Sequence, residues 1–165
     1  NTMDTKRFKQ FQEGLDAHLP GAVSEILAEE KGKDYCLIGI LTTDDFYGCY
    51  LAWDTTGSID EYFEWDEFET ETDFLYQPLV DVVEASKDVD LCTASPEKWA
   101  FAEAFLKVLE ESIKALPDEI FEKNGFNRED VLFFSTMSDG DYVEEMMNAS
   151  LGMFNSEETL EIFDF

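Results

Sequence analysis

The feature that most constrains the fold is a stretch from residue 35 to residue 42 that is apolar on both faces. Read as a β-strand, its two faces hold Tyr35, Leu37 and Leu41 and then Cys36, Ile38 and Ile40. A strand of this kind is usually central in a sheet and covered on both sides. We therefore expect it to mark the core of the domain.

A second stretch of aromatic and branched residues follows, up to Trp53. Such residues favour a pleated, half-buried surface, and the Thr-Thr-Asp-Asp sequence between the two stretches is typical of a turn. We predict two antiparallel strands joined by a turn at Thr43 to Phe46.

The three cysteines follow no metal or disulfide spacing. With the predicted turn, Cys36 lies opposite Trp53 and Cys49 lies opposite Ile40, so a disulfide across the hairpin is not expected. We expect Cys36, Cys49 and Cys92 to be reduced and buried, as in cytosolic proteins.

The residues before the hairpin show helical spacing. Residues 4–18 predict one helix, and Pro20 is expected to begin a second helix that Gly32 ends. His18, the only histidine, would then be an exposed residue at the end of the first helix.

Two helical patterns follow the hairpin. Ser58 with Glu61 three residues later forms a capping box, which predicts a short helix through about Trp65. Residues 74–84 are amphipathic, but Pro78 makes a continuous helix across them uncertain.

The C-terminal part begins with Ser95-Pro96, an N-cap followed by proline at the first helical position. An apolar stripe then predicts a long helix, with Trp99, Ala102, Leu106, Leu109, Ile113 and Leu116 facing inward. Residues 131–136 predict a third strand, residues 142–151 a helix, and Asn155-Ser156 the start of a last short helix.

This order of elements predicts a single α+β domain over residues 1–165, with an antiparallel sheet built on the central hairpin and packed with helices. Met3 is the expected natural start, with Asn1 and Thr2 added before it. No signal peptide or membrane span is expected, so we predict a cytoplasmic protein.

The charge is unusual. The formal net charge is −28, from 39 acidic and 11 basic residues. No Lys or Arg occurs between Lys33 and Lys87, and none follows Arg128. Such a field repels nucleic acid and anionic membranes and attracts basic partners. The alternative is that the acidity serves only solubility or reflects an acid-rich proteome.

No motif predicts catalysis or a cofactor. A Cys-His or Ser-His site would have to use His18, and zinc ligands at motif spacing are absent from the sequence. The acidic order in Ser138-Asp139-Gly140-Asp141 does not fit a calcium loop and is typical of a turn. We expect no catalytic residues, no metal and no cofactor.

Residues 60–73 interleave acidic and aromatic side chains, which together supply long-range attraction and buried anchors at an interface. We predict that the partner-binding residues are Asp60, Glu61, Glu64, Trp65, Asp66, Glu67, Phe68, Glu69, Glu71 and Asp73. The alternative is that Phe63, Trp65 and Phe68 belong to the core and the acids form a solvated rim.

The order of features from the hairpin onward resembles a bacterial family labelled domain of unknown function 4303. The segments that carry the resemblance are Thr43-Asp44-Asp45, Asp54-Thr55-Thr56, Phe63 to Phe68, the long helix before Phe126, Val131 to Ser135, Ser138-Asp139 and Met153-Phe154-Asn155. In that family the segment around Trp65 is usually more basic. The resemblance implies a small cytosolic α+β domain and brings no catalytic residues with it.

These observations favour an acidic, non-enzymatic binding protein of the immunity type, which neutralises a basic partner such as a cognate nuclease toxin. Small proteins of this kind often resemble immunity proteins of interbacterial toxin systems. The alternatives are an unidentified enzymatic role, which would require a pocket with converging polar groups, and a scaffold role. The oligomeric state is left open.

We expect added salt to stabilise the protein, because self-repulsion at a net charge of −28 opposes the compact state. Adding about 0.2 M salt, which shortens the Debye length to roughly 7 Å, should raise the melting temperature. Thermal unfolding followed by circular dichroism checks this. A melting temperature that does not change between low and moderate salt would contradict it.

Overall fold

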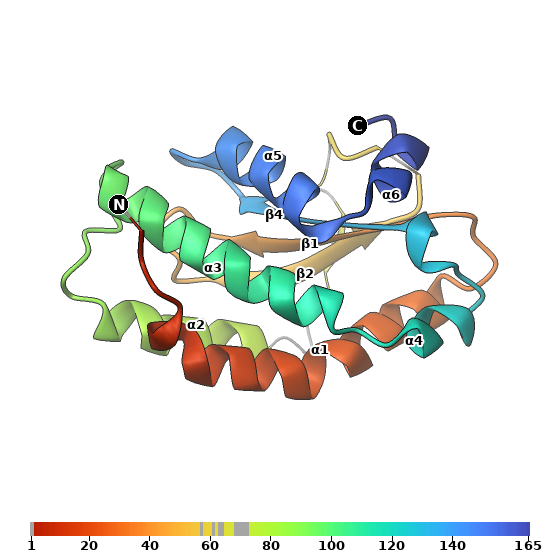
Figure 1. Ribbon diagram of the computed structural model, residues 1–165, viewed down its shortest axis with the longest axis horizontal. Coiled ribbons are helices and arrows are strands. Elements are labelled where there is room, and N and C mark those ends of the chain that lie inside the picture. Colours follow the sequence, from red (N-terminus) through yellow and green to blue (C-terminus); the bar gives the residue numbers. More distant parts are fainter. Residues whose placement is uncertain (1, 57, 61, 63–64, 68–72) are drawn as a thin grey trace.

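Strand β1 (Cys36–Thr42) lies inside the sheet and is buried along its whole length, as its two apolar faces predict. The computed structural model describes residues 2–56, 58–60, 62, 65–67 and 73–165 and is an α+β domain (Figure 1). The strand order is β3-β2-β1-β4, where β2 is Cys49–Asp54, β3 is Asp66–Glu67 and β4 is Val131–Met137.

The sheet is mixed rather than antiparallel, which corrects the prediction. β1 and β2 are antiparallel, but β4 lies parallel to β1, with Cys36 opposite Val131 and Thr42 opposite Met137. A parallel neighbour requires a long crossover connection. Here the connection is long, because after β2 and β3 the chain passes through α2 (Asp73–Ala85), α3 (Pro96–Lys114) and α4 (Asp118–Glu122) before β4.

The hairpin exists as predicted, but its register differs. Thr42 pairs with Cys49, and the connection runs from residue 43 to residue 48, closed by a hydrogen bond from Thr43 N to Gly48 O (3.1 Å). In this wider connection Phe46 has a positive φ of 64°, and its fully buried ring packs against Phe101 and Phe105 of α3. The two hairpin cysteines are not opposite each other, and both are free.

Helix α1 (Lys9–Glu29) follows a 3-10 turn at Lys6–Phe8 and continues through Pro20, so the predicted break is wrong. Proline inside a helix removes one hydrogen bond at a cost of about 3 kcal/mol. Burial offsets that cost, because Leu15, Leu19 and Val23, on both sides of the proline, are almost inaccessible to solvent. His18 is therefore exposed in the middle of a helix rather than at its end.

Helix α2 also continues through its proline, Pro78, over the span that the amphipathic pattern predicts. The capping-box helix from Ser58 to about Trp65 cannot be followed as a whole, because Glu61 and residues 63–64 lie outside the described residues. The described part shows Ser58 Oγ accepting from Asp60 N at 3.4 Å.

The two sequence signals for helix starts in the C-terminal part are confirmed. Ser95 Oγ accepts a hydrogen bond from Lys98 N (3.1 Å), and Pro96 is the first residue of α3. Helix α5 (Val143–Phe154) follows β4, and Ser156 then accepts from Thr159 N at the start of α6 (Glu157–Ile162).

The sheet separates two groups of buried side chains. On one face, β1 residues such as Ile38 and Ile40 join a large cluster with α1, α2, α3 and α4, in which Phe8 contacts Phe101 and Phe105. On the other face, residues such as Leu37 and Phe134 join a smaller cluster. Figure 1 shows α1 and α2 on one side of the sheet and α5 and α6 on the other.

The backbone along the outer edge of β4 is hydrogen-bonded by two side chains, one in α5 and one in the residue that follows α5. Ser150 Oγ accepts from Ser135 N (2.9 Å) and donates to Ser135 O (3.0 Å). Asn155 does the same for Phe133, with its Oδ1 2.9 Å from the backbone nitrogen and its Nδ2 2.7 Å from the carbonyl oxygen. These two side chains occupy the hydrogen-bonding positions of a missing neighbour strand.

The structure revises the predicted environment of the cysteines, because Cys92 is exposed while Cys36 and Cys49 are buried. Burial, and then the nearby Glu30 and Asp54, raises the pKa of Cys36 to about 12, and burial also raises the pKa of Cys49. Thiolates are the reactive form, so these two thiols should react slowly.

We therefore expect one thiol to label rapidly in the native protein and three to label after denaturation. Labelling with a chromogenic disulfide reagent measures both numbers. Cys92→Ser is the control and should remove the rapid phase alone. Rapid native labelling of more than one thiol would contradict the burial of Cys36 and Cys49.

Candidate functional site

The predicted partner-binding segment is described only in part. Asp60 and Asp73 are exposed, and Asp73 begins α2. Asp66 and Glu67 form β3, an edge strand that the sequence pattern did not predict and that pairs with Trp53 and Ala52. The remaining acidic and aromatic members, Glu61, Glu64, Phe68, Glu69 and Glu71, lie outside the described residues, as does Phe63.

The described aromatic residues of this region pack onto the sheet. The Trp65 ring is half-buried and meets the Phe134 ring edge-on, with 5.6 Å between centroids. Tyr62 is buried against the same ring, and its hydroxyl donates to Met137 O at 3.0 Å. Trp65 thus belongs in part to the core, as the alternative interpretation holds, and only part of its side chain faces solvent.

The structure brings together a charged cluster that the sequence analysis missed. The Lys98 side chain in the first turn of α3 is fully buried, and its Nζ lies 2.8 Å from Asp44 Oδ1 and 3.2 Å from Asp141 Oδ2. The two carboxylates remain partly open to solvent, with 35% and 40% of their side chains exposed. A single buried ammonium therefore joins the β1–β2 connection, the β4–α5 connection and α3.

The parallel pairing of β1 and β4 explains why these residues meet. The C-terminal ends of the two strands lie side by side, and Ser138 N donates to Thr42 O there at 2.8 Å. The next residues turn toward each other, and Asp141 N donates to Asp44 Oδ1 at 3.2 Å. Gly140 lies directly against the Asp44 carboxylate with a φ of 112°, and a Cβ at this position would collide with it. Only glycine suits both constraints.

Lys98 and Asp44 stabilise each other's charged form. Burial alone would lower the pKa of Lys98, but its hydrogen bonds to Asp44 and Asp141 outweigh that effect and raise the pKa. Partial burial would raise the pKa of Asp44, but the bonds from Lys98 and from Asp141 N lower it. Lys98 is thus held as a cation and Asp44 as an anion near neutral pH.

This chemistry favours a structural role for the cluster. A lysine acts as a nucleophile only when its pKa is depressed, and here the pKa is raised. No group of three His, Cys, Asp or Glu side chains suited to a metal occurs among the residues that the structure describes. The cluster instead fixes the positions of two acidic connections at one edge of the sheet.

A sequence signal for the cluster was present. Lys98 lies three and seven residues before Phe101 and Phe105, so all three share one face of α3. A lysine on the apolar face of a helix needs a buried partner. The predicted stripe instead placed Trp99 inward, whereas the structure leaves Trp99 only partly buried.

Comparisons with family models, with curated proteins and with solved structures found no match for this chain. The resemblance to domain of unknown function 4303 therefore stays a prediction. Within the described part of the chain, every helix is too short or too polar to cross a membrane.

We expect Lys98→Met to lower the free energy of unfolding by about 3 kcal/mol at pH 7, because it leaves two neighbouring carboxylates without their cation. Lys107→Met, an exposed position on the same helix, is the control and should change stability by less than about 0.5 kcal/mol. Urea unfolding of both variants and the unmodified protein measures the difference.

The loss caused by Lys98→Met should shrink in acid. A carboxyl group with a lowered pKa contributes stability above its unfolded pKa of about 4, and the contribution disappears as the pH falls through the folded value. Unfolding at pH 7 and pH 3 therefore tests whether Asp44 is the partner that matters. An equal loss at both pH values would contradict the ionic origin of the effect.

Proposed function

We propose that this protein is a non-enzymatic inhibitor of the immunity type, which binds and neutralises a basic partner such as a nuclease toxin. The observation that carries the proposal is the distribution of charge over the fold. The stretches 34–86 and 129–165 hold well over half of the 39 acidic residues and none of the 11 basic ones.

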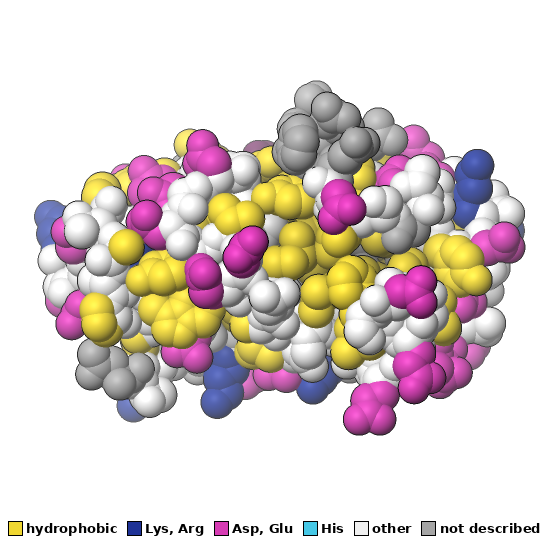
Figure 2. All heavy atoms as spheres, turned by 90° about the horizontal axis from the view of Figure 1, so that it is seen from above, with side chains coloured by type: hydrophobic (Ala, Val, Ile, Leu, Met, Phe, Trp, Pro, Cys, Tyr) yellow, Lys and Arg dark blue, Asp and Glu magenta, His cyan; other side chains and the backbone are white. Residues whose placement is uncertain are grey.

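These two stretches meet in the folded chain. The first contributes β1, β2, β3 and α2 and the second contributes β4, α5 and α6, and β1 pairs with β4. Helix α2 lies on the side of the sheet away from α5 and α6 (Figure 1). We call the side of the sheet that carries α5 and α6 the acidic face. In Figure 2, Asp and Glu side chains lie across this view, while Lys and Arg side chains lie at its margins.

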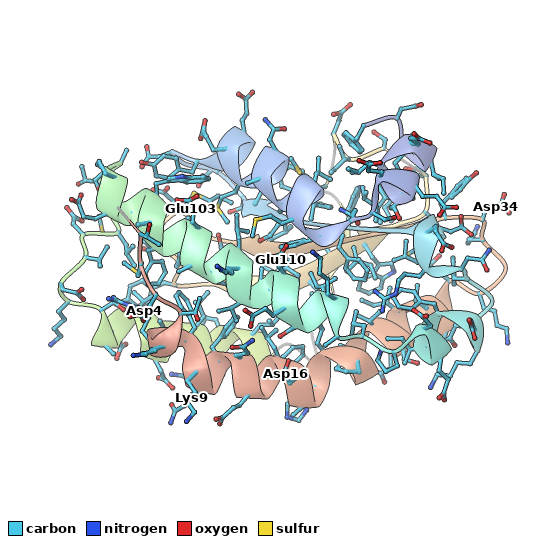
Figure 3. All side chains as sticks on the ribbon, viewed as in Figure 1. Asp4, Lys9, Asp16, Asp34, Glu103 and Glu110 are labelled. Atoms are coloured by element: carbon cyan, nitrogen blue, oxygen red, sulfur yellow. The ribbon has the colours of Figure 1, made fainter. Side chains whose placement is uncertain are left out.

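The opposite layer carries part of the basic charge. Lys9 extends from α1 into solvent on the side away from α5 and α6 (Figure 3). Helix α1 also carries the exposed Glu13, Glu25 and Glu29, so this layer is acidic too. The acidic face differs in that α5 and α6 hold acidic residues and no Lys or Arg. A surface without basic side chains attracts a basic protein and speeds its association.

The acidic face also offers apolar contact area. Half-buried side chains of the smaller cluster, namely Tyr50, Ile59, Trp65, Met147 and Leu160, lie at the surface between the charged residues. Figure 2 shows hydrophobic side chains gathered in a band over this side. An apolar centre with a charged rim is the usual composition of a protein–protein interface.

A nuclease toxin supplies the matching chemistry. Enzymes that act on nucleic acid present basic surfaces to phosphates, and an acidic protein can occupy such a surface. The same field keeps this protein itself away from nucleic acid.

The test is co-expression with a toxin-like gene that neighbours the gene for this protein, with cell growth and nuclease activity as readouts. We expect growth to be restored and a complex to form whose association rate falls as salt is added. Continued nuclease activity in the presence of excess inhibitor would contradict the proposal.

The acidic face is tested with Glu144, Glu158 and Glu161 changed together to Gln. The matched control changes Glu13, Glu25 and Glu29 on α1, which are also exposed and carry the same charge. We expect the first variant to slow association about tenfold or more and to flatten its salt dependence, and the control to have a much smaller effect. Equal effects of the two variants would show that only net charge matters.

A further inference from the structure

A shallow hollow lies at the end of the molecule where α3 and α5 begin. Its lining consists of Ala94, Ser95, Pro96, Trp99, Tyr142 and Glu145. The Trp99 and Tyr142 rings form its main surface, with their centroids 5.2 Å apart and their planes inclined by 49°. Both rings are only partly buried, so each presents part of its surface to solvent.

The hollow is held in a fixed shape. The Tyr142 hydroxyl donates to Ser95 O at 2.9 Å and accepts from Ser95 N at 3.1 Å, which ties the start of α5 to the start of α3. The neighbouring Asp141 is bound by the buried Lys98. Because the aromatic surface is ordered before any ligand arrives, binding there loses little conformational entropy.

The chemistry of the hollow matches one side chain in particular. Exposed aromatic surface attracts cations, and arginine more often than lysine, because the flat guanidinium stacks on a ring. Glu145 is exposed and supplies a carboxylate at the rim, which a guanidinium can bind through two parallel hydrogen bonds. Glu144, the preceding residue of α5, is also exposed and adds negative potential beside it. Asp141 pairs with Lys98, whose Nζ lies 6.0 Å from the Tyr142 ring centroid.

We propose that this hollow receives an arginine side chain of the partner protein, stacked on Trp99 and Tyr142 and paired with Glu145. The proposal rests on the proposed function, because it names the residue by which a basic partner is held rather than only attracted. The charge complementarity argues for a basic side chain, and the aromatic lining argues for arginine over lysine.

The hollow can be tested without knowledge of the partner. The probes are three peptides of sequence Gly-Gly-X-Gly-Gly with blocked ends, in which X is arginine, lysine or citrulline, the neutral isostere of arginine. Nuclear magnetic resonance at 0.15 M salt follows the indole N–H signal of Trp99. We expect a saturable shift with the arginine peptide and binding at least fivefold weaker with the other two.

Two single substitutions localise the binding. Glu145→Gln removes the rim carboxylate and should weaken the arginine peptide about fivefold. Glu13→Gln is the matched control, since it removes the same charge from an exposed position on α1 that does not line the hollow. Trp99→Phe keeps an aromatic ring of smaller surface and should weaken binding while leaving the fold intact.

The outcomes separate this proposal from the proposed function. Equal affinity for all three peptides, or equal losses from Glu145→Gln and Glu13→Gln, would overturn the arginine site. A toxin complex that forms normally with Glu145→Gln would likewise overturn it while leaving the inhibitor function in place. Selective arginine binding without any toxin complex would support the site and count against the inhibitor function.

Discussion

The rest of the structure depends on a strand that is apolar on both faces. β1 can be stable only if both faces are covered. Helices α1 to α4 cover one face, and residues 59–65, α6 and part of α5 cover the other. The pairing of β4 with β1 then brings two distant connections to one edge. The buried Lys98 joins them there, and the hollow formed by Trp99 and Tyr142 lies beside this cluster.

The fold also brings together the two stretches that lack Lys and Arg. The two stretches without Lys or Arg lie far apart in the sequence and are neighbours in the sheet. Lys98, where β1 and β4 end, is buried and paired with Asp44 and Asp141. It therefore holds these two carboxylates in place and presents no positive charge at the surface. The acidic face therefore combines ordered charge with half-exposed apolar and aromatic side chains, which is the composition expected of a surface that binds a basic protein.

The sequence predicted individual strands and helix starts better than it predicted how the strands pair and how distant side chains meet. The two-faced strand, the third strand and the Ser95 cap are local properties and were predicted. The direction of β4 depends on the long connection that separates it from β1, and the hairpin connection is longer than predicted, with Phe46 packed against α3. Pro20 stays helical because tertiary burial outweighs its local cost. The Lys98 cluster was missed because its partners come from two other parts of the chain.

The closure of the β4 edge has a consequence for the behaviour of the protein in concentrated solution. An open edge strand offers its backbone to strands of other molecules, which is a common route to aggregation. Here Ser150 and Asn155 already satisfy the outward groups of Ser135 and Phe133. The other edge, β3, is two residues long and both residues are acidic. Among the described residues, the edge of β4 is therefore the closed one, and lateral pairing of β4 with a strand of another molecule is blocked.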